Sequence, residues 1–299
     1  MSDGIVVPRN VAISAWVEEA KADAIKYQER QVTEILLHAV GITEALNEAL
    51  VLKGGVLMSL VHGSYRQTGD VDFTAIVDPE PYAELLKATL NRALPRAAAD
   101  LGFTDISCAV QRFDYQPKKE GFADFTAPAL KLNIGYAQKG TSDEARLKEG
   151  KSTRILQVDI SFKEKVVNTS EITIEEPDVT IQAYSFEEII AEKLRATLQQ
   201  VKRKRNRRQD VFDIRWLVEK YAPDVAARTI ILETLLEKSE DRDIVPTVES
   251  FDNEEVKERS SKEWDTMKLE IGGKLPDFEG SFKLVQKFYQ SLPWPAGKS

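Results

Sequence analysis

Apolar residues near the start of the chain recur at spacings of three and four, which is typical of an amphipathic helix. The spacing links Trp16, Val17, Ala20, Ala24, Val32, Ile35 and Leu36. It predicts one helix over about Val11–Val40, followed by a second over Thr43–Ala49. Another helix is predicted over Pro79–Leu101, because prolines stand at its start and Gly102 lies just past its end.

Short apolar or alternating runs predict the strands of the same half. The apolar run Leu50–Leu52 precedes Gly54-Gly55 and a short helical stretch that ends near His62. Asp70–Val77 alternates polar and apolar residues, as a half-buried strand does. Three further candidates, separated by polar loops, are Thr104–Phe113, Leu130–Ala137 and Arg154–Phe162.

From Phe186 onward the pattern is mostly helical. The predicted helices are Phe186–Val201, Asp210–Tyr221, Ala226–Lys238, Ser260–Leu269 and Phe282–Leu292. We therefore expect an α/β (α+β) fold, with a mixed-sheet domain over residues 1–176 and a helical region over residues 177–299. The boundary is predicted near Glu176-Pro177.

Composition is that of an ordinary globular protein. The chain has 299 residues, of which 42% are hydrophobic and 30% are charged, so it can bury a core without disulfides. Its start lacks a basic region followed by an apolar stretch, and no apolar run approaches the roughly 18 residues that cross a bilayer. We expect a cytoplasmic protein with no membrane partner.

Few residues could bind a soft metal. One cysteine, Cys108, and two histidines, His38 and His62, disfavour a zinc site and exclude an internal disulfide framework. A bound metal would then depend on carboxylates, whose oxygen atoms suit hard cations. The expected cofactor is therefore Mg²⁺ or Mn²⁺.

The segment from Leu50 to Phe73 carries the candidate chemistry. Gly54 and Gly55 follow a strand and precede a helix, so backbone amides can approach an anion such as a triphosphate. Asp70 and Asp72 stand two residues apart on a strand, which projects both carboxylates from one face and suits a divalent ion. An Asp-x-Asp pair alone is more often solvated or part of a turn, and it is the combination that indicates catalysis.

Asp159 is a candidate third acid, because it interrupts the apolar strand Leu156–Ser161. Converging carboxylates repel one another unless a dication is bound. In the expected two-metal mechanism Asp70, Asp72 and Asp159 are metal ligands, Asp159 helps to deprotonate the attacking hydroxyl, and pyrophosphate leaves. A capped strand end or a buried salt bridge is the structural alternative for Asp159.

Charge is segregated along the chain. The net charge of −8 argues against a surface that is basic everywhere, so nucleic acid would need a local patch. Glu249–Asp265 is dominated by acids. One run is strongly cationic, and its expected RNA-binding members are Lys202, Arg203, Lys204, Arg205 and Arg207. An exposed loop without RNA is the alternative interpretation.

Two motifs of the chain can be compared with those of known families. The first runs from Val51-Leu52-Lys53-Gly54-Gly55 through Arg66-Gln67-Thr68-Gly69-Asp70-Val71-Asp72-Phe73. The second joins Glu187–Ala196 to Arg207-Arg208-Gln209-Asp210-Val211-Phe212-Asp213-Ile214. Together they resemble the motifs of the AbiEii/AbiGii-like nucleotidyltransferase toxins, within the polymerase-beta-like superfamily, and the matched stretches run from about Val51 to Leu217 in the order that the family shows.

The resemblance implies roles for further residues. Lys193 would contact the nucleotide phosphates, and Asp210 would be a further functional acid. Lys193 could instead be an exposed lysine paired with Glu192 or Glu188, and Asp210 could be a helix N-cap; Asp213 ranks lower as a candidate. The full nucleotide-binding set is expected to be Lys53, Gly54, Gly55, Arg66, Thr68, Lys193 and Arg208.

The resemblance also implies a function. A toxin of this kind would transfer nucleotides from an NTP to an RNA, expected to be the 3′ end of a tRNA, and so inhibit translation and growth. Its partners would be that RNA and a separately encoded, AbiEi-like antitoxin that need not form a stable complex with it. Alternatives are a small-molecule nucleotidyltransferase of the antibiotic-modifying type and a catalytically silent nucleotide- or RNA-binding module.

Overall fold

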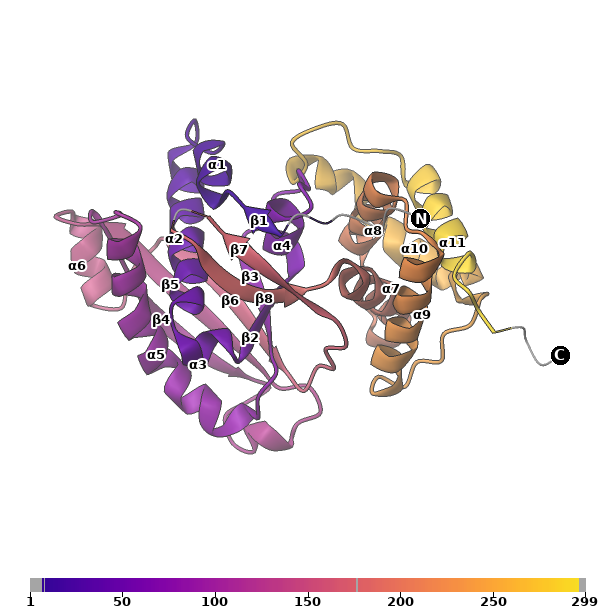
Figure 1. Cartoon of the computed structure of the whole chain (residues 1–299), viewed down its shortest axis with the longest axis horizontal. Helices are drawn as coiled ribbons and strands as arrows, with labels where there is room; N and C mark the ends of the chain where they lie inside the picture. Colours follow the sequence, from indigo (N-terminus) through magenta and orange to yellow (C-terminus); the bar gives the residue numbers. More distant parts are fainter. Residues whose placement is uncertain (1–6, 8, 176, 296–299) are drawn as a thin grey trace.

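A computed structural model describes residues 7, 9–175 and 177–295, and the N-terminal part of these forms one mixed sheet of eight strands (Figure 1). The sheet order is β1-β7-β8-β2-β3-β6-β5-β4. The strands are β1 Asn10–Val11, β2 Leu50–Lys53, β3 Asp70–Ala75, β4 Ile106–Gln116, β5 Ala129–Gln138, β6 Ile155–Phe162, β7 Thr169–Ile174 and β8 Val179–Tyr184. The expected mixed α/β class is confirmed.

The centre of the sheet sets the register of the acidic residues. β3 pairs antiparallel with β2 and parallel with β6, so that Asp72 lies between Lys53 and Asp159 in one row across three strands. Along β3, Val71 and Phe73 are buried, whereas Asp70 and Asp72 are partly accessible. Because side chains alternate along a strand, the acids share the face opposite these core residues.

Six α-helices accompany the sheet within the described N-terminal half. They are α1 Ile13–Glu18, α2 Ala24–Gly41, α3 Glu44–Asn47, α4 Gly54–Leu60, α5 Pro79–Asp100 and α6 Ser142–Lys148. The prediction of one helix over Val11–Val40 was wrong, because Asp23 begins a new helix by accepting hydrogen bonds from the amides of Ile25 and Lys26 at 3.1 and 3.2 Å. α2 and α5 pack against each other and against the sheet.

The C-terminal helices gather beside the sheet, with α7 nearest to it (Figure 1). They are α7 Phe186–Arg203, α8 Arg208–Tyr221, α9 Val225–Glu240, α10 Glu254–Ser261 and α11 Phe278–Gln290. The helix predicted over Ser260–Leu269 was wrong: α10 ends at Ser261, Glu263 has a φ of 59°, and a 3-10 helix, η3, covers Trp264–Leu269. None of the helices in the described ranges combines the length and apolar character that crossing a bilayer requires.

A β-hairpin occupies the region of the expected domain boundary. Glu176 itself lies outside the described residues, and β7 and β8 on either side of it pair antiparallel. β8 also pairs in parallel with β2. The sheet therefore extends to Tyr184, and the helical region begins at Phe186.

Candidate functional site

A cleft of about 480 Å³ lies between the central strands and α7 and α8. It brings together most of the residues that the sequence suggested. Those that line it are Lys53, Gly54, Gly55, Arg66, Thr68, Asp70, Asp72, Asp159, Lys193, Arg203, Arg205, Arg207 and Asp210. Lys202, Lys204 and Arg208 do not line this cleft.

The acids of β3 occupy the sheet side of the cleft. Asp70 accepts a hydrogen bond from Thr68 Oγ1 at 2.7 Å, which fixes its carboxylate. Burial raises the pKa of Asp72 to about 7, with a further increase from the charges of Asp70 and Asp159, although Lys53 opposes it. Asp72 therefore sits where negative charge is not fully compensated.

Gly54 and Gly55 allow the turn after β2 to pack directly against the loop that contains Thr68 and against Asp72 on β3. A Cβ atom on Gly55 would come within 2.5 Å of Thr68 Oγ1, and one on Gly54 would overlap the Asp72 carboxylate. Gly54 also has a φ of +73°, which L side chains rarely adopt. The sequence suggested that these glycines open the backbone to an anion, and the structure adds that they make room for Asp72 and Thr68.

Asp159 forms an ion pair that the sequence did not reveal. Lys131, its register partner on β5, places Nζ 2.9 Å from Asp159 Oδ2, and both side chains are solvent-accessible. Asp159 is thus neither a strand-end cap nor part of a buried salt bridge. Lys131 occupies an ordinary polar position of an alternating strand, so only the strand register could have identified it.

The acids of the cleft differ in how well they suit a metal ion. Within the described residues, no group of three or more His, Cys, Asp or Glu side chains is placed to hold a metal ion. Asp70 and Asp72 nevertheless offer carboxylate oxygens on one face, and burial, together with the neighbouring charge of Asp70, raises the pKa of Asp72. These two residues fit a hard divalent cation, and Asp159 would join them only after releasing Lys131.

Lys193 and Asp210 lie on the helical side of the cleft. Lys193 Nζ is 3.3 Å from Asp210 Oδ1 and 2.7 Å from Asp213 Oδ2, so Lys193 is not the exposed, glutamate-paired lysine of the alternative interpretation. Asp210 does not cap a helix, because α8 begins earlier, at Arg208, with Arg207 as its N-cap. Asp213, which ranked lower, also binds Arg66 in a bidentate pair.

Comparison with known proteins gives the chain its family. Residues 35–290 match the family described as nucleotidyl transferase AbiEii toxin of type IV toxin–antitoxin systems. The chain belongs to the AbiEii family. This AbiEii-family protein is also similar in fold to MenT4, a nucleotidyltransferase toxin from Mycobacterium tuberculosis H37Rv, with a TM-score of 0.54 and 14% identity over 94% of this chain and 90% of that one. None of the curated proteins matches the sequence.

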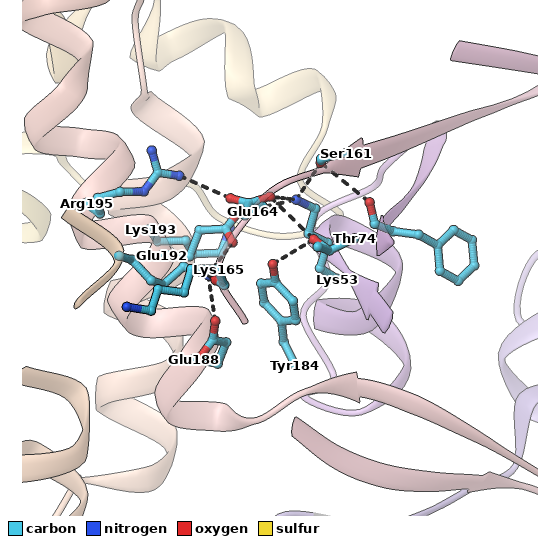
Figure 2. A network of polar contacts seen from close by, with 12 residues as sticks. Lys53, Thr74, Ser161, Glu164, Lys165, Tyr184, Glu188, Glu192, Lys193 and Arg195 are labelled. Carbon is cyan, nitrogen blue, oxygen red and sulfur yellow. Dashed lines mark hydrogen bonds and ion pairs between the residues drawn. The ribbon is translucent and has the colours of Figure 1, made fainter. Parts of the chain in front are cut away.

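In this AbiEii-family cleft Lys53 is engaged by protein groups. Its ammonium group donates to Ser161 Oγ at 2.9 Å and to Glu164, and it lies 3.8 Å from Glu192 (Figure 2). Burial opposes the charge on Lys53, but these acids outweigh it and raise the pKa of Lys53 above its ordinary value. Lys53 reaches the cleft as part of a charge network rather than as a free cation.

The same network joins the sheet to the helical region (Figure 2). Glu164, which follows β6, lies 3.5 Å from Arg195 on α7. Deeper in the protein, Lys238 on α9 lies 2.6 Å from Glu188 on α7, with both side chains almost fully buried. Sequence patterns missed this network, because its members are far apart in the chain and each has an unremarkable local context.

The cationic run divides between the cleft and the surface. Arg203, Arg205 and Arg207 line the cleft together with Arg242, which the sequence did not suggest. Burial and the surrounding arginines, Arg242 first among them, lower the pKa of Arg203. Lys202 instead pairs with Asp243 at 2.9 Å.

Arg208 was predicted to bind nucleotide but is held by acids of the C-terminal region. It lies 2.9 Å from Glu270 and 3.1 Å from Glu263. The Glu270 carbonyl accepts the amide of Gln67 at 2.6 Å, and Ile271 forms a β-bridge with Arg66. Arg208 thus helps to hold the segment that supports the Arg66–Thr68 loop.

Proposed function

We propose that this AbiEii-family protein transfers a nucleotide from an NTP to an RNA and releases pyrophosphate. The observation that carries the proposal is the row formed by Asp72 on β3 and Asp159 on β6, with Asp70 on the same face and the Gly54-Gly55 turn beside them. Carboxylate oxygens of the kind that hard divalent cations prefer, next to a glycine backbone that can approach phosphates, support this proposal.

Asp70 and Asp72 would hold Mg²⁺ or Mn²⁺, which when bound supplies Lewis acidity and neutralises phosphate charge. Thr68 keeps the Asp70 carboxylate oriented, and Arg66 and Lys193 bind the outer phosphates. The acceptor hydroxyl attacks the α-phosphorus while the bond to the bridging oxygen breaks, so that pyrophosphate leaves. Asp159, once released by Lys131, accepts the hydroxyl proton.

The arginines at the cleft support an RNA acceptor. Arg203, Arg205 and Arg242 line the cleft without an ion-pair partner among the described residues. Clustered cations attract a polyanion and repel cationic acceptors such as amine-rich antibiotics. The proposed acceptor is the 3′ end of a tRNA, whose modification would inhibit translation and growth in the cytoplasm.

A separately encoded antitoxin is the second proposed partner. The type IV toxin–antitoxin description of the family supports its existence. We propose control by an AbiEi-like antitoxin that forms no lasting complex with this chain.

Incubation of the purified protein with α-labelled NTPs, Mg²⁺ and total RNA tests the acceptor. The proposal expects label in the tRNA fraction, added at 3′ ends, and none when Asp72→Asn replaces the wild type. Label that appears on a small-molecule acceptor and never in RNA would overturn the RNA assignment. Binding of NTP or RNA without any transfer would favour a silent binding module.

A further inference from the structure

Two cations from separate segments share one buried carboxylate. Arg66, in the loop between α4 and β3, donates from Nε to Asp213 Oδ1 at 3.0 Å and from Nη2 to Oδ2 at 2.9 Å. Lys193, on α7, donates to the same Oδ2 at 2.7 Å. The Asp213 side chain on α8 has an exposed fraction of 0%. Asp213 therefore contacts both cations while remaining out of reach of any ligand.

The carboxylate balances two like charges that would otherwise repel. Arg66 and Lys193 both line the cleft, whereas Asp213 does not. Burial opposes the charge of Lys193, yet Asp213 and then Asp210 outweigh it and raise the pKa of Lys193. Without the Asp213 carboxylate between them, the buried cations Arg66 and Lys193 would repel each other and move apart.

Asp210 lies three residues before Asp213 on α8, and the surroundings of the two carboxylates differ. Asp210 lines the cleft, and its buried Oδ2 has no hydrogen-bond partner among the described residues, although Arg207 Nη1 lies 3.7 Å from it as an ion pair. Both oxygens of Asp213 are occupied by Arg66 and Lys193. Asp210 therefore keeps one oxygen without a hydrogen bond at the cleft, whereas both oxygens of Asp213 are hydrogen-bonded to protein groups.

We propose that Asp213 is a positioning residue that fixes Arg66 and Lys193 side by side for the NTP phosphates. The inference rests on the proposed function, in which these two cations contact the outer phosphates. Asp213 joins the loop that precedes the β3 carboxylates to the two helices of the opposite wall. It thereby sets the distance between the cations and the acids across the cleft.

The test measures the affinity of wild type and Asp213→Asn for a non-hydrolysable NTP, the matching NDP and the nucleoside, with Mg²⁺ present. At metal sites, loss of a group that orients a ligating side chain costs about tenfold to a hundredfold in metal affinity or activity, and we expect an effect of similar size here. We expect NTP affinity to fall at least about tenfold and nucleoside affinity to stay within about twofold, with NDP between them. An equal loss for all three ligands, or no loss, would overturn the inference.

Wild-type affinities distinguish the inference from its premise. A wild type that binds nucleoside and NTP equally well would refute the phosphate contacts of Arg66 and Lys193, and the role of Asp213 with them. NTP affinity that depends on phosphates but is unchanged in Asp213→Asn would refute the role of Asp213 alone.

A charge-balanced variant covers the case in which Asp213→Asn does not fold, as judged by thermal unfolding. Asp213→Asn combined with Lys193→Met removes one cation along with the anion, and is compared with Lys193→Met alone. We expect the double variant to lose further NTP affinity relative to nucleoside, because Arg66 loses its bidentate partner. Equal NTP affinities of the two variants would overturn the inference.

Discussion

A Cβ atom added to Gly54 would lie 2.0 Å from Oδ2 of Asp72. The turn that ends β2 and the carboxylate of β3 are thus in direct contact, and only a glycine permits it at this position. Anion access and the placement of Asp72 depend on the same residue. A change at Gly54 should therefore affect the proposed metal ligand as well as phosphate binding.

Gly54→Ala should reduce nucleotidyl transfer by at least about a hundredfold, because a displacement near 1 Å at a reacting centre has that effect. The left-handed backbone and the overlap should also lower the free energy of unfolding by about 1 to 3 kcal/mol. Steady-state transfer assays and urea unfolding measure the two effects.

Gly69→Ala is the matched control, because a Cβ on Gly69 meets no atom within 4 Å. It belongs to the same motif and should keep near-wild-type transfer and stability. Equal damage from both substitutions would contradict the contact argument.

The raised pKa of Asp72 predicts a pH-dependent stability without divalent cations. Its folded pKa of about 7 exceeds the ordinary value of 3.8, so the folded state favours the protonated acid. The resulting stabilisation is complete below the ordinary pKa and is lost as the pH rises through about 7. With a chelator present, we expect Asp72 to account for a decrease of up to about 4 kcal/mol in unfolding free energy.

The unfolding free energy of wild type and of Asp72→Asn, measured from pH 4 to pH 8, checks this prediction. It should decrease less with rising pH in the variant, because the variant lacks the carboxyl group that titrates. Mg²⁺ should bind more tightly to the wild type as the pH passes 7. An identical dependence of unfolding free energy on pH in the two proteins would show that Asp72 does not titrate as described.

Five strands of the N-terminal half could be predicted from sequence, but β1, β7 and β8 were not, and the pairing of the strands could not be predicted. β2, the glycine turn and β3 each have a distinct pattern within a few residues. β7 was missed because Thr169–Ile174 is polar and half-exposed, so its identity as a strand depends on pairing with β8 and β1. The break before α2 depends on the single cap at Asp23.

The buried pair Lys238–Glu188 should contribute strongly to stability. Lys238→Ala would leave the Glu188 carboxylate without its cation in a site that is 0% exposed, which costs about 3 to 5 kcal/mol in unfolding free energy. Lys238→Met with Glu188→Gln removes both charges and should recover much of that loss. Chemical unfolding of the three proteins measures this.

Lys165→Ala provides the exposed counterpart. Lys165 pairs with Glu237 at 2.8 Å, and both side chains are 40% exposed. Its loss should cost far less stability than the loss of Lys238, because an exposed ion pair is screened by solvent. If Lys238→Ala were no more destabilising than Lys165→Ala, the buried pair of Lys238 and Glu188 would not stabilise the packing of α9 against α7.

The arginines that line the cleft should be distinguishable from their basic neighbours. Replacing Arg203, Arg205 and Arg242 by glutamine should weaken RNA binding and reduce the salt dependence by about 0.7 to 1 in slope for each phosphate that is no longer neutralised. Lys202→Gln with Lys204→Gln, in the same run but outside the cleft, should have a smaller effect. Titrations of labelled tRNA at several salt concentrations provide the slopes, and equal slopes in both sets would refute a specific role for the cleft.

Side-chain partners were the least predictable part of the site. Lys53 and Glu164 are 111 residues apart, and Arg66 and Asp213 are 147 apart. Periodicity reports the burial of each residue along its own element and carries no information about which distant charge faces it. The candidate acids could therefore be named from sequence, whereas Lys131, Glu164, Arg242 and the central place of Asp213 required the fold.

The proposed function requires the β3 carboxylates for nucleotidyl transfer in this cleft. Transfer of α-labelled nucleotide to tRNA with Mg²⁺ is measured for the wild type and for Asp72→Asn verified to be folded. We expect incorporation and pyrophosphate release by the wild type, and a decrease of at least about a thousandfold in the variant, because a metal ligand at the reacting centre is lost. Equal incorporation by the two folded proteins would contradict this expectation.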